Sequence, residues 1–187
     1  MVALQNASPM PDLTAVNSWR STPTPFEANT PAAAVAELHS RSSATGNTYD
    51  QSAQTNEEDG DTFLAENKQK EGVRTTASGL QYKVIKEGTG PQPTENDDVV
   101  TVNYRGTFIN GREFDSSYKH GRPATFQLNK VIKGWWEGLQ LMKVGSKYQL
   151  FIPAKLAYGN RAVGHVIGPN STLIFDVELL GVKSRGR

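Results

Sequence analysis

The residues of this chain that could do chemistry are aromatic and aliphatic side chains gathered in its second half. They are Tyr104, Phe114, Phe126, Val131, Ile132, Trp135, Tyr158, Ile167 and Phe175, with one carboxylate, Asp115, beside Phe114. These residue types suit the enclosure of an apolar ring. The chain has no Cys, and its three His residues stand far apart in the sequence. The pattern therefore predicts a dry binding site whose chemistry needs no covalent step.

Composition argues against several classes of partner. The 187 residues carry 20 Lys and Arg against 19 Asp and Glu, so nothing indicates a basic surface for nucleic acid. No pair of His has the spacing of metal ligands, and we expect neither a metal nor a cofactor. No apolar run approaches the roughly 18 residues of a membrane span, and the chain opens without a signal-peptide pattern. We therefore expect a soluble, uncleaved protein.

Composition changes near residue 60. Residues 1–60 are rich in Ser, Thr, Asn, Gln, Ala and Pro, and their apolar residues are isolated. Such a segment buries too little apolar surface to offset the entropy lost on ordering, which predicts a disordered tail. A short lead-in helix is expected over residues 61–72, with Asp61 as N-cap and Gly72 at its end. We expect this helix to be solvated, with a docking face as the alternative.

From Leu80 onward apolar residues recur with a period of two, which is typical of half-buried antiparallel strands. The pattern covers residues 80–84, 100–108, 148–152 and 173–179, and a short strand is indicated at Phe126 and Leu128. Asn110-Gly111 favours a tight hairpin turn that returns the chain toward Glu113. These strands are predicted to form one sheet in a domain that spans residues 73–187.

One helix is predicted within this domain, with Asn129 as its N-cap. Its apolar face is formed by Ile132, Trp135, Leu139 and Met142. Gly134 and Gly138 cost about 1 kcal/mol each in a helix, a cost that is tolerable if their missing side chains let the helix approach the strands closely. The expected fold is therefore α+β, with a strongly bent antiparallel sheet of five or six strands around one short helix.

Six stretches of the sequence carry a family resemblance. They are "FLAENKQKEGV", "SGLQYKVIKEGTG", "VTVNYRGTFINGREFDSSY", "PATFQLNKVIKGWWEGLQLMKVGSKYQLFIP", "LAYG" and "TLIFDVELL". Together they resemble the FKBP-type peptidyl-prolyl cis-trans isomerases, and most closely their macrophage infectivity potentiator branch. The resemblance runs from about Thr62 to Val182, roughly two thirds of the chain.

The resemblance implies a role for each position of the site. Trp135 would be the floor under a substrate proline ring, with aromatic walls at Tyr104, Phe126 and Phe175. Phe114 and Asp115 match the family's "FD", Val131 and Ile132 would line one side, and Ile167 would close the rim. The Ile132 backbone N–H and the Tyr158 hydroxyl would bind substrate carbonyls. Plain core packing is the alternative for Trp135, Phe126 and Phe175, and a turn role is the alternative for Asp115.

The resemblance also implies an activity, the isomerisation of X-Pro bonds in folding or unfolded polypeptides. Implied ligands are proline-containing polypeptides and compounds of the tacrolimus and rapamycin type. The alternative is a binding module that holds proline-containing partners as a chaperone or adaptor without useful turnover. Many relatives of the Mip branch carry a dimerising N-terminal segment and an export signal. Neither is visible here, so we expect a monomer in the cytoplasm, with the periplasm or outer membrane as the alternative if the true N-terminus carries an export signal.

The long connection from Ala154 to Ser171 is expected to be a functional flap, because ordered loops rarely exceed roughly 12 to 15 residues. It departs from the family pattern at Val163, His165 and Gly168, which bears on ligand preference more than on activity. His120, in a separate loop, is expected to be solvated, with a pH-sensitive rim residue as the alternative.

Overall fold

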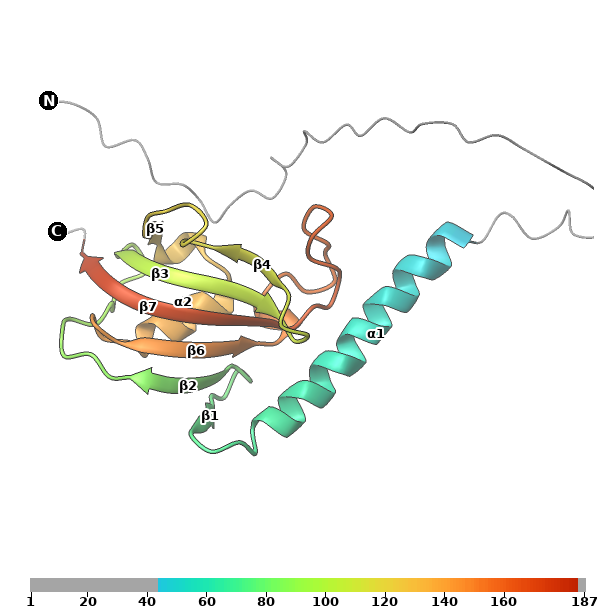
Figure 1. Ribbon diagram of the computed structural model, residues 1–187, viewed down its shortest axis with the longest axis horizontal. Helices are drawn as coiled ribbons and strands as arrows, with labels where there is room; N and C mark the ends of the chain where they lie inside the picture. Colours follow the sequence, from blue (N-terminus) through green and yellow to red (C-terminus); the bar gives the residue numbers. More distant parts are fainter. Residues whose placement is uncertain (1–43, 185–187) are drawn as a thin grey trace, which may run out of the picture.

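A long helix leads into a curled antiparallel sheet that holds one short helix (Figure 1). The computed structural model describes residues 44–184. The helices are α1 (Ala44–Asn67) and α2 (Lys133–Gln140), with 3-10 turns η2 (Leu128–Lys130) and η3 (Ala154–Leu156). The strands are β1 (Val73–Thr75), β2 (Gln81–Lys86), β3 (Val99–Phe108), β4 (Glu113–Ser116), β5 (Ala124–Gln127), β6 (Lys147–Ile152) and β7 (Leu173–Lys183).

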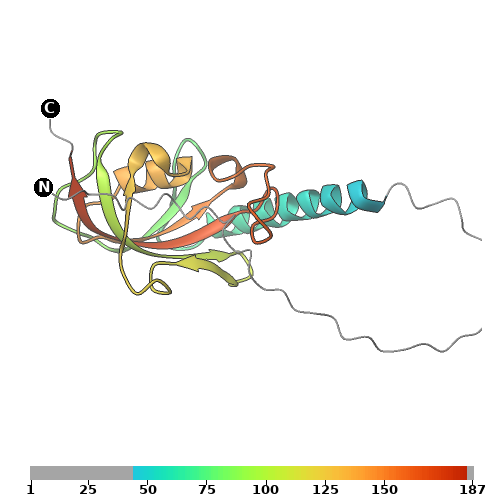
Figure 2. The same cartoon turned by 90° about the horizontal axis from the view of Figure 1, so that it is seen from above.

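The sheet is organised around β3. Its strand order is β1-β2-β6-β7-β3-β4, and β5 also pairs with β3. β7 pairs along the whole of β3, whereas on the other side β5 pairs with residues 99–102 and β4 with residues 105–107. All pairings are antiparallel. Figure 2 shows the sheet curving around α2, which confirms the predicted α+β class. The three-residue β1 was not anticipated and brings the sheet to seven strands.

The period-two pattern is confirmed by burial along the two central strands. Buried side chains alternate with half-buried ones in β3 from Val100 to Tyr104 and in β7 from Leu173 to Leu179. The hairpin at Asn110-Gly111 is also confirmed, since Gly111 has φ +82° and its N–H donates to the Phe108 carbonyl at 2.9 Å. One face of the sheet therefore forms the core on which α2 rests.

The expected close approach of α2 to the sheet is confirmed at both glycines. A Cβ at Gly138 would lie 2.7 Å from Leu150 Cδ1, and one at Gly134 would meet the side chain of Ile152. The predicted N-cap is wrong, because Asn129 lies in η2 and α2 begins only at Lys133. The chain stays extended through Val131 and Ile132, with ψ of 165° and 152°. Because of this extended link the helix begins later in the sequence than predicted, and the side chains of Val131 and Ile132 pack against the core.

Helix α1 corrects the predicted organisation of the N-terminal region. The tail was expected to reach residue 60 and the lead-in helix to start at Asp61, yet α1 begins at Ala44 and Asp61 lies inside it. The helix ends at Asn67, before the expected end at residue 72. Side chains of α1 contact the sheet domain, among them Asn56, Phe63 and Asn67. The part of the predicted tail before residue 44 lies outside the described residues.

Candidate functional site

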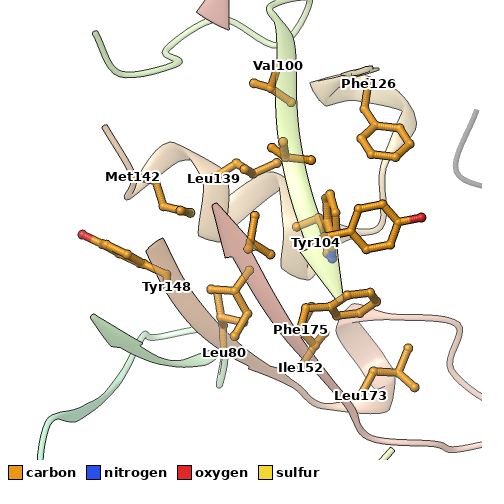
Figure 3. Packing of buried hydrophobic residues seen from close by; sticks show 14 of the residues in the cluster. Leu80, Val100, Tyr104, Phe126, Leu139, Met142, Tyr148, Ile152, Leu173 and Phe175 are labelled. Atoms are coloured by element: carbon orange, nitrogen blue, oxygen red, sulfur yellow. The ribbon is translucent and has the colours of Figure 1, made fainter. Parts of the chain in front are cut away.

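Three aromatic rings pack around Trp135, which α2 places against the concave face of the sheet. Its ring centroid lies 5.3 Å from that of Tyr104, 5.5 Å from Phe126 and 5.2 Å from Phe175, with interplanar angles of 82°, 88° and 87°. Edge-to-face contacts of this kind are favourable for aromatic pairs. Figure 3 shows Tyr104, Phe126 and Phe175 converging from different strands. The structure thus brings together the predicted floor and walls.

The other apolar residues of the predicted site surround this centre. Phe114, on β4, packs edge-on against Phe175 at a centroid distance of 5.5 Å. Val131 and Ile132 lie in the link between η2 and α2, whereas Tyr158 and Ile167 come from the connection between η3 and β7. All of them belong to or pack against one hydrophobic cluster. Residues far apart in the sequence therefore meet at one end of α2.

Burial divides the site into two layers. Trp135 exposes 0% of its surface, Phe175 1% and Ile167 2%, so these side chains belong to the protein core. Phe114, Val131, Ile132 and Tyr158 are half-buried and form the accessible layer. Core packing, the alternative raised from the sequence, therefore describes the position of Trp135 in this structure. A ligand would reach its ring only if the accessible layer moved apart.

A carboxylate lies beside the aromatic centre. The Tyr104 hydroxyl donates to Asp115 Oδ2 at 2.5 Å. Burial, and then the hydrogen bond to Asp115, raise the pKa of Tyr104 far above its usual range. The phenol therefore remains a donor at neutral pH. Asp115 sits on β4 opposite Gly106 of β3, so the sheet register fixes its position. The turn role raised as the alternative for Asp115 does not match this strand position.

Besides the buried indole N–H of Trp135, two donors beside the rings make no hydrogen bond to any residue from 44 to 184. They are the Ile132 backbone N–H and the Tyr158 hydroxyl. Burial, and then the charge of Asp115, raise the pKa of Tyr158, so its hydroxyl stays protonated at neutral pH. The Ile132 carbonyl, by contrast, is engaged by the N–H groups of Trp135 and Trp136 at 3.0 Å. An apolar surface flanked by two free donors suits a peptide segment with an apolar ring and two carbonyls.

His120, expected to be a solvated loop residue, lies beside Asp115. Its side chain is 61% exposed, as expected of a loop residue, but Nε2 lies 3.4 Å from Asp115 Oδ1. The loop after β4 turns back at Gly121, whose φ is +67°. The preceding turn is closed by the His120 N–H, which donates to the Ser117 carbonyl at 3.1 Å and keeps His120 near the end of β4. The glycine was the one sequence signal, and it does not specify which neighbour His120 contacts.

The described residues form neither a cluster of metal ligands nor a helix that could span a membrane. Within residues 44–184 no three His, Asp or Glu side chains gather as metal ligands. In the same span neither helix is long and apolar enough to cross a bilayer.

Family models match most of the chain. Residues 90–180 match the model of the FKBP-type peptidyl-prolyl cis-trans isomerase. Residues 16–84 match the model of the domain amino-terminal to that isomerase.

Individual relatives and a solved structure agree with these models. The outer membrane protein MIP of Legionella longbeachae is 53% identical over 135 residues, which are 72% of this chain and 58% of that protein. The FKBP-type 22 kDa isomerase of Escherichia coli K12 is 48% identical over 149 residues, or 80% of this chain and 70% of that protein. The crystal structure of FkpA from E. coli has a TM-score of 0.72 at 45% identity, covering 75% of this chain and 65% of that one.

The comparisons correct one prediction and settle the family. A cytoplasmic location is contradicted, because one of the most similar relatives carries the name outer membrane protein, which points away from the cytoplasm. The chain spans about half the length of the first curated relatives it matches, with 58%, 47% and 53% of their residues covered. The family itself is shown by the 22 kDa relative, most of whose length this chain covers at 48% identity. By its sequence and by its fold, this chain belongs to the FKBP-type peptidyl-prolyl cis-trans isomerase family.

Proposed function

We propose that this protein catalyses the cis–trans isomerisation of X-Pro bonds in folding or unfolded polypeptides. The observation that carries the proposal is the group of three aromatic rings set edge-on around Trp135 at 5.2–5.5 Å. Beside them lie the Ile132 N–H and the Tyr158 hydroxyl, two donors that bond to no other residue the structure describes. A proline ring is the apolar ring that a peptide offers between two carbonyl groups. The site matches that combination.

The proposed mechanism follows from the electronic structure of the peptide bond. Rotation about C–N meets a barrier of about 18–20 kcal/mol because resonance gives the bond double-bond character. The planar form is dipolar and is stabilised by water. In a dry site the planar form loses more of that stabilisation than the twisted form, which is less charge-separated. Each 1.36 kcal/mol of difference gives about a tenfold increase in rate.

The residues act in this mechanism without a covalent intermediate. Phe114, Val131 and Ile132 would hold the proline ring above the buried Trp135. Ile167, expected at the rim, is buried and would support this layer from the core instead. The Ile132 N–H and the Tyr158 hydroxyl would donate to the substrate carbonyls and favour the twisted geometry. Asp115, held by Tyr104, would support the twisted carbonyl by a dipolar interaction. No general base is required.

Ligands and assembly are part of the same proposal. The family acts on proline-containing peptides, and we propose these as substrates, with tacrolimus- and rapamycin-type compounds as ligands of the same site. We propose a monomer, because the side chains of α1 that face away from the sheet domain between residues 49 and 66 are mostly polar or charged and offer no apolar face to a second chain.

Exchange spectroscopy on an Ala-Leu-Pro-Phe peptide tests the activity. The protein should produce exchange cross-peaks between the cis and trans signals at a catalytic concentration. Phe114→Ala should abolish them while leaving the protein folded, because Phe114 is only half-buried. Ile85→Ala is the matched control, since Ile85 is 53% exposed and lies on β2, outside the site.

Absence of catalysis would reject the proposal, and peptide binding would then decide which function replaces it. A folded protein that leaves the two conformers interchanging at their spontaneous rate is not an isomerase of this peptide class. If the peptide nevertheless binds, with shifts that map to Phe114 and Tyr158, the binding-module alternative replaces catalysis.

A further inference from the structure

Helix α1 packs on the sheet domain through one narrow stripe. Between Tyr49 and Asn67 the positions that are not exposed are 53, 56, 60, 63, 64 and 67, and all the others are exposed. This spacing of three and four residues is one face of a helix. Ala53, Asn56, Gly60 and Asn67 make this face mostly small or polar. Figures 1 and 2 both show α1 beside the connection that precedes β7.

The C-terminal half of α1 is fixed to the sheet. Asn67 Nδ2 donates to Gln81 Oε1 at 3.0 Å, and Gln81 Nε2 donates to the Leu64 carbonyl at 2.8 Å. At Gly60 the helix comes so close that an added Cβ would lie 3.2 Å from Thr172 Cβ and would overlap Thr172 Oγ1. The buried position of Gly60 in mid-helix is therefore explained by close packing, because glycine otherwise weakens a helix.

The N-terminal half of α1 contacts the flap itself, the connection from Ala154 to Ser171. Asn56 Nδ2 donates to the Pro169 carbonyl at 2.8 Å. Asn170 Nδ2 donates to the Ala53 carbonyl at 3.3 Å and to Glu57 Oε2 at 3.0 Å. A Cβ at Gly168 would lie 2.9 Å from Asn56 Nδ2. The glycine that departs from the family pattern thus leaves room for the helix to reach the flap.

Asn170 joins these helix contacts to the site. Its φ is +53°, a left-handed conformation that Asn tolerates better than other side chains. In this conformation its side chain reaches α1 while its N–H donates to the Gly159 carbonyl at 2.8 Å. Gly159 directly follows Tyr158, one of the free donors of the site. One residue therefore connects α1 to the base of the segment that carries Tyr158.

We propose that α1 positions the flap through Asn170, and that this docking sets how tightly Tyr158 holds a substrate. Asn170 is a positioning residue, since it acts through Gly159 and touches no substrate. A cleft of about 410 Å³ remains beside the stripe, lined by Asp61, Lys155 and Thr172 among others. Among the described residues, α1 contacts the flap through hydrogen bonds of Tyr49, Asn56 and Asn170. Its packing on the sheet includes Phe63, whose ring centroid lies 6.0 Å from that of Phe151. Substitutions at the flap contacts should therefore loosen the flap while α1 stays on the sheet. The effect on substrate rests on the proposed function, whereas the docking itself does not.

Amide hydrogen exchange and peptide kinetics on the full chain test the proposal. Asn170→Gly keeps the left-handed backbone and removes the amide, and Asn56→Ala removes the second contact. Gln54→Ala is the control, because Gln54 bonds Glu58 at 2.9 Å on the exposed side of the same helix. Both test variants should speed exchange at the Gly159, Val163 and Ile167 amides and raise KM roughly three- to tenfold with little change in kcat.

The outcomes separate the two proposals. If Asn170→Gly and Asn56→Ala leave flap exchange at the wild-type rate, or if Gln54→Ala changes it equally, the positioning role is rejected. Should Asn170→Gly fail to fold, Asn56→Ala decides alone, because it leaves the backbone of the flap unchanged. Should the wild-type chain lack isomerase activity, the exchange data still decide whether α1 holds the flap, and only the proposed function fails.

Discussion

Substitution of Gly134 by Ala tests whether α2 is held against the sheet at the distance that places Trp135. An added Cβ would overlap Ile152 Cγ2 and lie 3.0 Å from its Cδ1 and 3.1 Å from its Cγ1. Ile152 exposes 0% of its surface and lies on β6. Its β-branched side chain has little rotamer freedom with which to move away. The helix must therefore shift, and Trp135 must shift with it.

The two contributions to stability have opposite signs. In a free helix, Gly→Ala stabilises by about 1 kcal/mol. Overpacking a filled core costs about 1–3 kcal/mol, and the stiffness of Ile152 favours the upper part of that range. We therefore expect Gly134→Ala to lower the free energy of unfolding by about 1–2 kcal/mol. The corresponding fall in Tm is about 2–4 °C per kcal/mol for a chain of this size.

Urea unfolding of a double-mutant cycle measures the packing term. Ile152→Ala alone should cost about 2–5 kcal/mol. In that background Gly134→Ala should become neutral or stabilising by up to about 1 kcal/mol, a coupling of about 1–3 kcal/mol. An increase in stability of the single Gly134→Ala variant, with no coupling to Ile152, would refute the close approach and the inferred placement of Trp135.

Three further predictions concern the site and its support. Tyr104→Phe leaves Asp115 Oδ2 without its donor, so urea unfolding should show a loss of about 1–3 kcal/mol together with a lower kcat/KM; unchanged values in both would remove Asp115 from the site. Asp98 is 1% exposed; burial alone would raise its pKa, but hydrogen bonds from two backbone N–H groups lower that pKa below its usual value. The ionised Asp98 therefore stabilises the fold above its pKa in the unfolded chain, and this stabilisation is lost as pH falls through its lower pKa in the folded protein. The difference in Tm between wild type and Asp98→Asn should thus be constant near neutral pH and should disappear below about pH 4. Phe114→Ala should lower the free energy of unfolding by less than the loss of about 3–5 kcal/mol that is typical of a fully buried ring, and the peptide Kd measured by titration should rise. A larger loss of stability with an unchanged Kd would assign Phe114 to the core alone.

The local sequence pattern was sufficient to predict most of the strands and turns of the sheet domain. Alternation predicted β3 and β7, and Asn110-Gly111 predicted the hairpin, because side-chain period and turn chemistry are properties of neighbouring residues. The glycines of α2 predicted its approach to the strands. The family motifs named the aromatic residues that the structure groups at Trp135. The start of α2 was misplaced, since the extended link through Ile132 is imposed by packing and not by a capping side chain.

The sequence by itself determined that aromatic residues on short strands would surround one amphipathic helix, because the hydrophobic period and the glycine spacing depend only on residues close together in the sequence. Tertiary structure alone decided that α1 reaches back to Ala44, that Trp135 is wholly buried, and that His120 approaches Asp115. Helix α1 has a mostly polar contact face, so its stability depends on partners such as Asn170 that lie more than a hundred residues away. Contacts between distant segments have no signature in the local pattern, since their energy exists only once the chain has folded.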